Sequence, residues 1–107
     1  MRYWGMFTLP VEIPRQAVAA FCQRHHIRKI SLFGSILTDR FSPESDIDML
    51  VEFEPGSGPG LLGIAGMEIE LSELLGRKVD LRTPRDLSRY FREEVLASAV
   101  PQYERPA

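Results

Sequence analysis

The chain has 107 residues, of which 44% are hydrophobic and 26% are charged, a composition typical of a single globular domain. Its 13 Lys and Arg against 15 Asp and Glu give a net charge of -2, so it lacks the basic excess of a general nucleic-acid-binding surface, although a nucleotide is not excluded as a substrate. One cysteine, Cys22, excludes an intrachain disulfide framework and a Cys-rich zinc site, and fits a reducing cytosol. No apolar run is long enough to span a bilayer and the N-terminus lacks the pattern of a signal peptide, so we expect a cytoplasmic protein that does not enter the membrane.

The predicted elements alternate between helices and strands. Apolar residues at helical spacing, with start and stop residues around them, predict helices over residues 14–26, 35–41, 61–75 and 83–99. Alternating or continuous apolar runs predict strands over residues 28–33, 46–53 and 78–82. The last helix is expected to bury an apolar face made by Leu87, Tyr90, Phe91, Val95 and Leu96.

This order of elements predicts an α/β (α+β) domain, with a small mixed sheet of three to four strands that is flanked by helices and covered mainly on one side. The predicted domain spans residues 14–104. Residues 1–13 have no periodic pattern and are interpreted as an extended arm whose aromatic side chains pack on the domain or on a partner. Pro101 ends the last helix, so the chain from residue 102 is expected to be loose, with residues 105–107 as a tail outside the domain.

Two aspartates stand at the start of the second predicted strand. Asp46 and Asp48 are two residues apart, so their side chains point to the same face of a strand, about 6–7 Å apart along it. Two like charges at this distance disfavour each other unless a cation lies between them. Hard carboxylate oxygens suit Mg²⁺, which takes a few protein ligands together with water and substrate phosphates. In a two-metal site one carboxylate usually bridges the ions, which lie about 3.5–4 Å apart.

A third acid stands in the last predicted strand. Asp80 lies between Val79 and Leu81, so it faces away from both apolar neighbours. If this strand lies beside the strand that carries Asp46 and Asp48, all three carboxylates converge.

Gly34 and Ser35 stand where a predicted strand gives way to a helix. Glycine lets the backbone approach a phosphate closely, serine adds a hydroxyl, and the free N–H groups of a helix start favour an anion. The phosphate cradle and the carboxylates together predict a site for a nucleoside triphosphate with Mg²⁺.

Each pattern also has a purely structural interpretation. A Gly-Ser pair is common at turns, an Asp-x-Asp pair can lie on a solvated strand edge, and a lone Asp80 can be a surface acid. The combination is more specific, because Asp is depleted in strand interiors and two predicted strands carry it among Val, Leu and Ile.

These segments resemble the nucleotidyltransferase superfamily of the DNA polymerase β type. The resemblance rests on Phe33-Gly34-Ser35, a ten-residue spacer, the Ser-Asp-Ile-Asp-Met-Leu-Val run at 45–51, and Val-Asp-Leu at 79–81. Within the superfamily the chain is most similar to the minimal nucleotidyltransferase (MNT) proteins, from about residue 27 to residue 104. The resemblance implies the palm fold of these enzymes.

The resemblance also implies roles for the acids. Asp46 and Asp48 would bind Mg²⁺, with two ions expected, and Asp80 would be the third acid, which ligates a metal and helps to deprotonate the acceptor hydroxyl. The acceptor oxygen would attack the α-phosphorus of ATP in line, and pyrophosphate would leave.

The implied nucleotide-binding residues are Gly34, Ser35, Arg40 and Ser45, with Gly34 and Ser35 holding the triphosphate. Family members often carry an Ala-Arg-Gly-like stretch after Gly-Ser, whereas residues 37–39 here are Leu-Thr-Asp and Arg40 is displaced. Arg40 or Lys78 is therefore the candidate basic contact to the phosphates.

MNT proteins of this size are similar to the antitoxin half of HEPN/MNT toxin–antitoxin pairs, in which the antitoxin transfers AMP from ATP to a tyrosine of the HEPN RNase. The resemblance thus implies a HEPN toxin as partner and no direct contact to nucleic acid. The chain would form either a homodimer or a hetero-oligomer with the toxin. One alternative is a non-catalytic module that neutralises the toxin by complex formation alone, with the aromatic residues of the N-terminal arm at the interface. A second is nucleotidyl transfer to a small molecule, for which a dimer would have to build the acceptor pocket.

Overall fold

The computed structural model describes residues 3–4, 7–8 and 10–106. Its centre is a sheet of four strands, β3 (Ile27–Phe33), β4 (Ile47–Phe53), β5 (Val79–Arg82) and β6 (Val100–Glu104), in the order β5-β4-β3-β6. β5 is parallel to β4, and the other pairs are antiparallel. The mixed sheet confirms the predicted α+β class.

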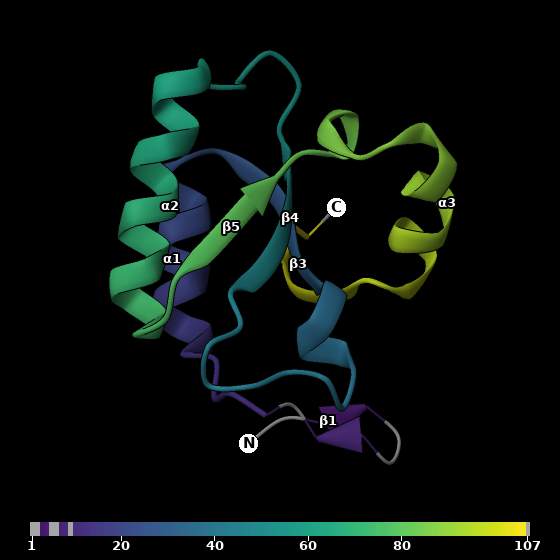
Figure 1. Cartoon of the computed structure of the whole chain (residues 1–107). Coiled ribbons are helices and arrows are strands. Elements are labelled where there is room, and N and C mark those ends of the chain that lie inside the picture. Colours follow the sequence, from purple (N-terminus) through teal and green to yellow (C-terminus); the bar gives the residue numbers. More distant parts are fainter. Residues whose placement is uncertain (1–2, 5–6, 9, 107) are drawn as a thin grey trace.

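Helices pack closely on only one face of this sheet among the described residues, as expected for a sheet covered mainly on one side. α1 (Arg15–Arg24) and α2 (Leu61–Leu75) lie together on one side, whereas α3 (Arg89–Ser98) stands alone on the other side (Figure 1). Two short 3₁₀ helices, η1 (Gly34–Leu37) and η2 (Pro84–Asp86), follow β3 and β5. No helix in the described part of the chain combines the length and apolar character that a membrane span requires.

The main core lies between the sheet and the α1–α2 layer. It is built by alternate strand residues and by one stripe of each helix, which is how elements with one apolar side bury it. Its largest fully buried side chains include Phe21, Ile30, Leu32, Ile47, Met49 and Leu71. Because Ile47 and Met49 use this face of β4, the intervening Asp48 is directed to the opposite face.

Cys22 belongs to this core, and burial raises the pKa of its thiol to about 12. The thiolate is the reactive form of cysteine, and it is scarce at such a pKa. We expect the native protein at pH 8 to react with a thiol reagent at least about a hundredfold more slowly than the unfolded chain in urea. Rapid labelling of one thiol in the folded protein, followed by mass spectrometry, would contradict the described burial.

The outer edge of β5 is closed by side chains of α2. The Ser72 hydroxyl accepts a hydrogen bond from the Val79 N–H at 3.0 Å and donates one to the Glu68 carbonyl, and the Glu68 carboxylate accepts the Leu81 N–H at 2.7 Å. An edge strand otherwise leaves such donors unpaired. These two contacts hold β5 against α2 and so fix the strand that carries Asp80.

Replacement of Ser72 by alanine removes the acceptor for the Val79 N–H. We expect the free energy of unfolding in urea to fall by about 1–2 kcal/mol, because an unpaired donor then remains beside the core. Ser98→Ala is the matched control, since the Ser98 hydroxyl bonds only to carbonyls of its own exposed helix, and it should change stability by less than about 0.5 kcal/mol. Equal losses in the two variants would show that Ser72 does not hold the edge.

The segment predicted as one helix over 83–99 is two separate helices. Thr83 and Asp86 form a capping box at the start of η2, and the Ser88 side chain accepts a hydrogen bond from the Tyr90 N–H at the start of α3. Local caps therefore break the segment where apolar periodicity alone continues it. The helix predicted over 61–75 has the bounds of α2, whereas the helix predicted over 14–26 is shortened to α1 and the one predicted over 35–41 is replaced by the short 3₁₀ helix η1.

The prediction that α3 buries an apolar face is wrong for three of its five residues. Tyr90 is 80% exposed, Phe91 61% and Leu96 42%, and α3 has no buried residue. Leu87 and Val95 are partly buried. The helix is anchored instead by Arg92, whose guanidinium donates hydrogen bonds to the carbonyls of Pro84 and Leu87. Helical periodicity indicates an apolar stripe but does not say what covers it.

The chain after Pro101 is a strand rather than a loose end. β6 pairs with β3 at the edge of the sheet, where a proline without an N–H is tolerated. At the N-terminus, β1 (Tyr3–Trp4) and β2 (Phe7–Thr8) form a short antiparallel pair within the region interpreted as an arm. The predicted packing of its aromatic side chains lies outside the described residues.

Candidate active site

The site begins where β3 ends. Gly34 has φ of +79°, a left-handed conformation that residues with a Cβ avoid, and it turns the chain from β3 into η1. A Cβ at this position would collide with the Asp48 carboxylate oxygen Oδ2 on the neighbouring strand. The backbone of the Gly-Ser turn is thus in contact with a candidate metal ligand, so the predicted phosphate cradle and acids meet here.

The register of β4 and β5 places the acids side by side. Asp48 is opposite Asp80 in the parallel pair, and Asp46 directly precedes β4, where the Ile47 N–H donates to the Lys78 carbonyl at 2.8 Å. Val79 and Leu81 point into the core, so Asp80 faces the other side as predicted. We call Asp46, Asp48 and Asp80 the carboxylate set.

Electrostatics within the carboxylate set follow from this placement. The pKa of Asp48 is raised above its ordinary value, first by burial and then by the negative charges of Asp80 and Asp46. Both causes penalise the ionised form. A cation bound among these carboxylates would relieve the repulsion between them, so their charges favour a metal ion at this place.

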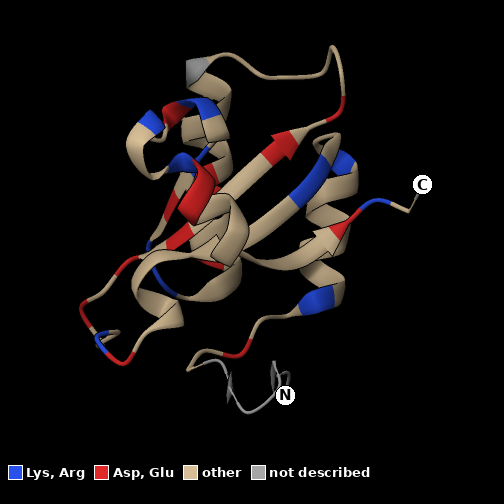
Figure 2. Ribbon diagram, turned by 90° about the vertical axis from the view of Figure 1, so that its right-hand side faces the viewer, with Lys and Arg blue, Asp and Glu red and all other residues tan. Residues whose placement is uncertain are grey.

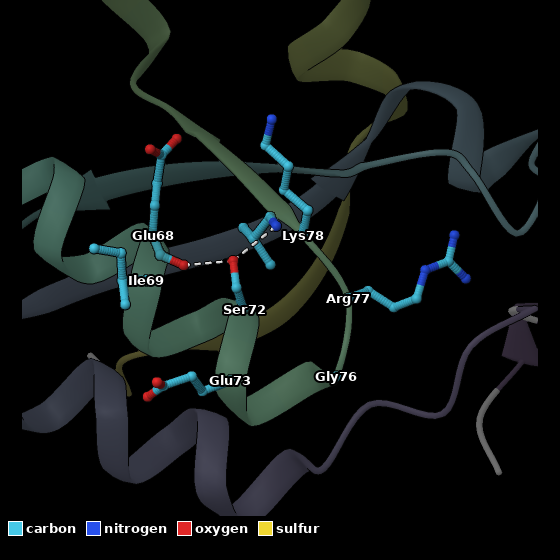
Figure 3. Close-up of a pocket in the computed structure, with 8 residues that line it drawn as sticks. Glu68, Ile69, Ser72, Glu73, Gly76, Arg77 and Lys78 are labelled. Carbon is cyan, nitrogen blue, oxygen red and sulfur yellow. Dashed lines mark hydrogen bonds between the residues drawn. The ribbon is translucent and has the colours of Figure 1, made fainter.

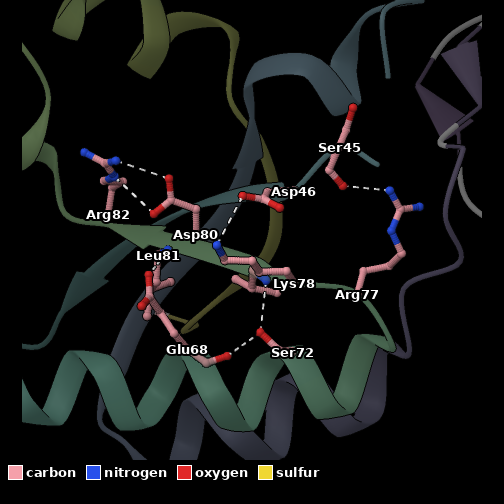
Figure 4. A network of polar contacts seen from close by, with 10 residues as sticks. Ser45, Asp46, Glu68, Ser72, Arg77, Lys78, Asp80, Leu81 and Arg82 are labelled. Carbon is pink, nitrogen blue, oxygen red and sulfur yellow. Dashed lines mark hydrogen bonds and ion pairs between the residues drawn. The ribbon is translucent and has the colours of Figure 1, made fainter. Parts of the chain in front are cut away.

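Two basic residues, Arg82 of β5 and Lys78 directly before it, pair with members of the carboxylate set. The Arg82 guanidinium donates two hydrogen bonds to Asp80, from Nε to Oδ1 and from Nη2 to Oδ2, both at 3.2 Å. The Lys78 ammonium lies 3.8 Å from Asp46 Oδ2 (Figure 4). The ion pair with Asp80 also raises the pKa of Arg82.

The three acids share a face, but within the described residues no three His, Cys, Asp or Glu side chains lie close enough together to hold a metal ion. Asp80 is turned toward Arg82, and Asp46 is directed toward Lys78. The predicted neighbourhood of the two strands is therefore present, whereas the predicted convergence of all three carboxylates is not seen in these side-chain positions. Their role as ligands stays a prediction.

A pocket of about 690 Å³ opens beside the Gly-Ser turn. Gly34, Ser35 and Arg40 line it from one side, and Glu94 and Val95 of α3 line it from the other. Arg40 is exposed, so its guanidinium is available at this pocket. Three of the four predicted nucleotide-binding residues are thus together.

Ser45, the fourth, does not line this pocket, and its nucleotide-binding role stays a prediction. Its hydroxyl accepts the Ser42 N–H at 3.0 Å inside the turn that precedes Asp46. Arg77 ties the same turn down by donating to the carbonyls of Ser42 and Ser45, at 2.8 and 2.7 Å, and its guanidinium stacks on the Phe41 ring (Figure 4). Ser45 and Arg77 therefore fix the approach of the chain to Asp46.

A second pocket, of about 530 Å³, lies between α2 and β5 (Figure 3). It is lined by Ile69, Glu73 and Arg77 among others, and only Lys78 links it to the carboxylate set. On the side of the molecule viewed in Figure 2, acidic and basic residues are interspersed.

Sequence reasoning missed two groups at the site. Arg82 was not singled out, although its spacing of two from Asp80 on a strand places both on one face. Glu68 and Ser72 were read only as helix residues, and no sequence pattern reveals that α2 closes the edge of β5.

Comparison with known proteins agrees with this geometry. Residues 14–101 match the model of the nucleotidyltransferase domain family, so the chain belongs to this family. It is 35% identical over 89 residues to a candidate protein adenylyltransferase of Methanocaldococcus jannaschii, covering 83% of this chain and 92% of that protein. It is 36% identical over 78 residues to the protein adenylyltransferase MntA of Thermococcus cleftensis, covering 73% and 77%.

Solved structures give the same picture of the fold. A protein described as a candidate minimal nucleotidyltransferase superposes with a TM-score of 0.67 at 39% identity, over 81% of this chain and 87% of the other. A MNT antitoxin in complex with a tri-AMPylated HEPN toxin of Shewanella oneidensis matches with a TM-score of 0.62 at 19% identity, over 85% and 70%. A toxin–antitoxin structure with AMP-PNP matches with a TM-score of 0.70 at 19% identity, over 87% and 75%. The resemblance to MNT proteins is confirmed.

Proposed function

We propose that this chain transfers AMP from Mg-ATP to a tyrosine hydroxyl of a partner HEPN RNase toxin and thereby silences it in the cytoplasm. The observation that carries the proposal is the contact between Gly34 and Asp48, with Asp80 opposite Asp48 on the next strand. A phosphate-binding turn and paired carboxylates at one point are what nucleotidyl transfer requires. Relatives named protein adenylyltransferase support the class of reaction.

The residues of the site fit a divalent cation. The carboxylate set offers hard oxygens, and burial together with the negative charges of Asp80 and Asp46 raises the pKa of Asp48, a cost that a bound cation would offset. Asp46, Asp48 and Asp80 would hold the metal, with two ions proposed. When bound, Mg²⁺ supplies positive charge to the phosphate oxygens and to the acceptor oxygen.

The chain's own residues supply the remaining functions. The Gly34–Ser35 turn binds the triphosphate through backbone N–H groups and the serine hydroxyl, and Arg40 contacts it from the pocket rim. Asp80 accepts the proton of the tyrosine hydroxyl. The tyrosine oxygen forms a bond to the α-phosphorus, the bond from that phosphorus to the bridging oxygen breaks, and pyrophosphate leaves.

The acceptor protein has a surface to dock on. α3 presents Tyr90, Phe91 and Leu96 to solvent next to the pocket that Glu94 and Val95 line. Exposed aromatic and aliphatic side chains are typical of protein interfaces. We place the toxin against α3, from where its tyrosine reaches the Gly-Ser turn.

Turnover separates this proposal from neutralisation by complex formation alone. A cognate HEPN RNase, sought as the product of the neighbouring gene, is incubated with a substoichiometric amount of the chain, and RNA cleavage is measured. An enzyme silences all of the toxin with Mg-ATP but not with α,β-methylene ATP, in which the bond to the α-phosphorus cannot be cleaved to release pyrophosphate. Silencing only at equal amounts, with or without nucleotide, would refute catalysis in favour of a binding antitoxin.

A further inference from the structure

Arg82 differs from the other charged residues near the site, because it binds both oxygens of one acid of the carboxylate set, Asp80. Its two hydrogen bonds to Asp80, both at 3.2 Å, use both oxygens of that carboxylate. Bidentate Arg–carboxylate pairs are among the strongest hydrogen-bonded ion pairs. A carboxylate whose two oxygens are both engaged has fewer lone pairs free for a metal.

The alternation of side chains along β5 explains why Arg82 is so placed. Asp80 and Arg82 are spaced by two and share one face of β5, and Lys78, directly before the strand, continues the same spacing. The parallel register sets Asp48 beside Asp80 and sets the uncharged Leu50 beside Arg82. Asp80 is thus the acid that Arg82 can pair with on its own strand.

Lys78, directly before β5, provides a natural comparison. Its ammonium makes one long contact, 3.8 Å to Asp46, and its side chain is 78% exposed. The Arg82 and Asp80 side chains are 48% and 33% exposed and are joined at two points. The two basic residues carry the same charge but differ in how closely they hold their acid.

From this geometry, and resting on the proposed function, we infer that Arg82 is a displaceable counter-ion of Asp80. In the absence of a divalent cation it holds the third acid away from Asp46 and Asp48. A cation that binds all three carboxylates must first break the hydrogen bonds between Arg82 and Asp80, so that the Asp80 oxygens are free to ligate it. Arg82 is therefore a positioning residue that weakens metal binding to the free chain and sets when the third carboxylate joins the other two.

The test is Mn²⁺ binding by calorimetry, without nucleotide, so that activity is not the readout. We expect Arg82→Met to bind Mn²⁺ about three- to tenfold more tightly than the wild type, since the competing guanidinium is gone. Lys78→Met removes the same charge from the same face and should change the affinity by less than about twofold. Arg82→Lys, which keeps the charge but not the two-point geometry, should fall between the wild type and Arg82→Met.

A double variant shows whether the effect passes through Asp80. In an Asp80→Asn background, Arg82→Met should leave the Mn²⁺ affinity unchanged within about twofold, because the pair no longer exists. A second readout is the NMR resonance of the Arg82 side-chain Nε–H group. We expect it to move when Mg²⁺ is added to the wild type and to stay in place in Asp80→Asn.

Two results would overturn the inference while the proposed function stands. One is an equal gain in affinity for Lys78→Met and Arg82→Met, which would mark a general charge effect. The other is an Arg82 resonance that ignores Mg²⁺ although calorimetry shows the metal bound. If wild type and all variants bind no Mn²⁺ even with ATP added, the metal site of the proposed function fails, and the inference fails with it.

Discussion

Replacing Asp48 by asparagine should lower AMP transfer by about a thousandfold or more, because the variant loses a negative oxygen at the centre of the carboxylate set. Transfer is measured from labelled ATP onto the partner under single-turnover conditions. Glu52→Gln is the matched control, since Glu52 lies on the same face of the same strand, four residues further along, and pairs with Arg28. We expect that control to keep its activity within about twofold.

The same variant should be more stable than the wild type when no metal is present. The folded-state pKa of Asp48 is raised, so the folded protein holds that proton more tightly than the unfolded chain does. Ionisation of Asp48 therefore costs stability as the pH rises from about 3.8, the ordinary pKa of an aspartate, through the raised folded-state pKa. The asparagine variant lacks this cost.

We expect the melting temperature of Asp48→Asn to exceed that of the wild type by about 2–5 °C at pH 7 in EDTA. The difference should shrink as the pH falls below the unfolded-state pKa, where the carboxyl is protonated in both states. It should also shrink when Mg²⁺ is added, because only the wild type gains stability from the metal. A variant that is less stable at every pH would show that Asp48 carries no repulsive charge in the fold.

Replacing Gly34 by alanine has the second large expected effect. The residue has φ of +79°, and its new methyl group would collide with the Asp48 carboxylate. The left-handed conformation costs about 1 kcal/mol, and the collision costs about 1–3 kcal/mol more. Because the strain is relieved by moving the turn or Asp48, we also expect AMP transfer to fall by about a hundredfold.

Gly56→Ala separates the two causes. Gly56 has nearly the same φ, +78°, but a Cβ there meets no atom within 4 Å. It should lose about 1 kcal/mol of unfolding free energy in urea, through the backbone alone, and keep full transfer activity. If both alanine variants lose the same stability and neither loses activity, the contact between Gly34 and Asp48 has no role in the site.

The sequence was sufficient to predict the parts of the site that depend on strand alternation. Asp80 faces away from Val79 and Leu81 because a strand has a period of two, and that period does not depend on neighbours. Strand alternation does not determine that β4 pairs with β5, and the structure shows this pairing in the parallel register that sets Asp48 beside Asp80. The order of helices and strands is compatible with several sheet topologies, and the family resemblance favoured the palm fold among them.

Features that depend on which part of the chain or which partner an element packs against could not be predicted from the sequence. The apolar stripe of α3 has the same sequence pattern whether it faces a core or a partner, and Tyr90 and Phe91 are exposed. β6 contains Pro101, which is read as a breaker unless the strand is known to be an edge strand. The pairing of Arg82 with Asp80 is a choice between side-chain conformations, which residue spacing permits but does not determine.

The central claim is that the carboxylate set and the Gly34–Ser35 turn form one site for AMP transfer to a protein. Its most direct test is the intact mass of the partner HEPN protein after incubation with this chain, Mg²⁺ and ATP. The account predicts a partner mass higher by one or more AMP units, no increase with the Asp46→Asn/Asp48→Asn variant, and an unchanged increase with Glu52→Gln. A tight complex whose partner keeps its original mass under all of these conditions would contradict the account.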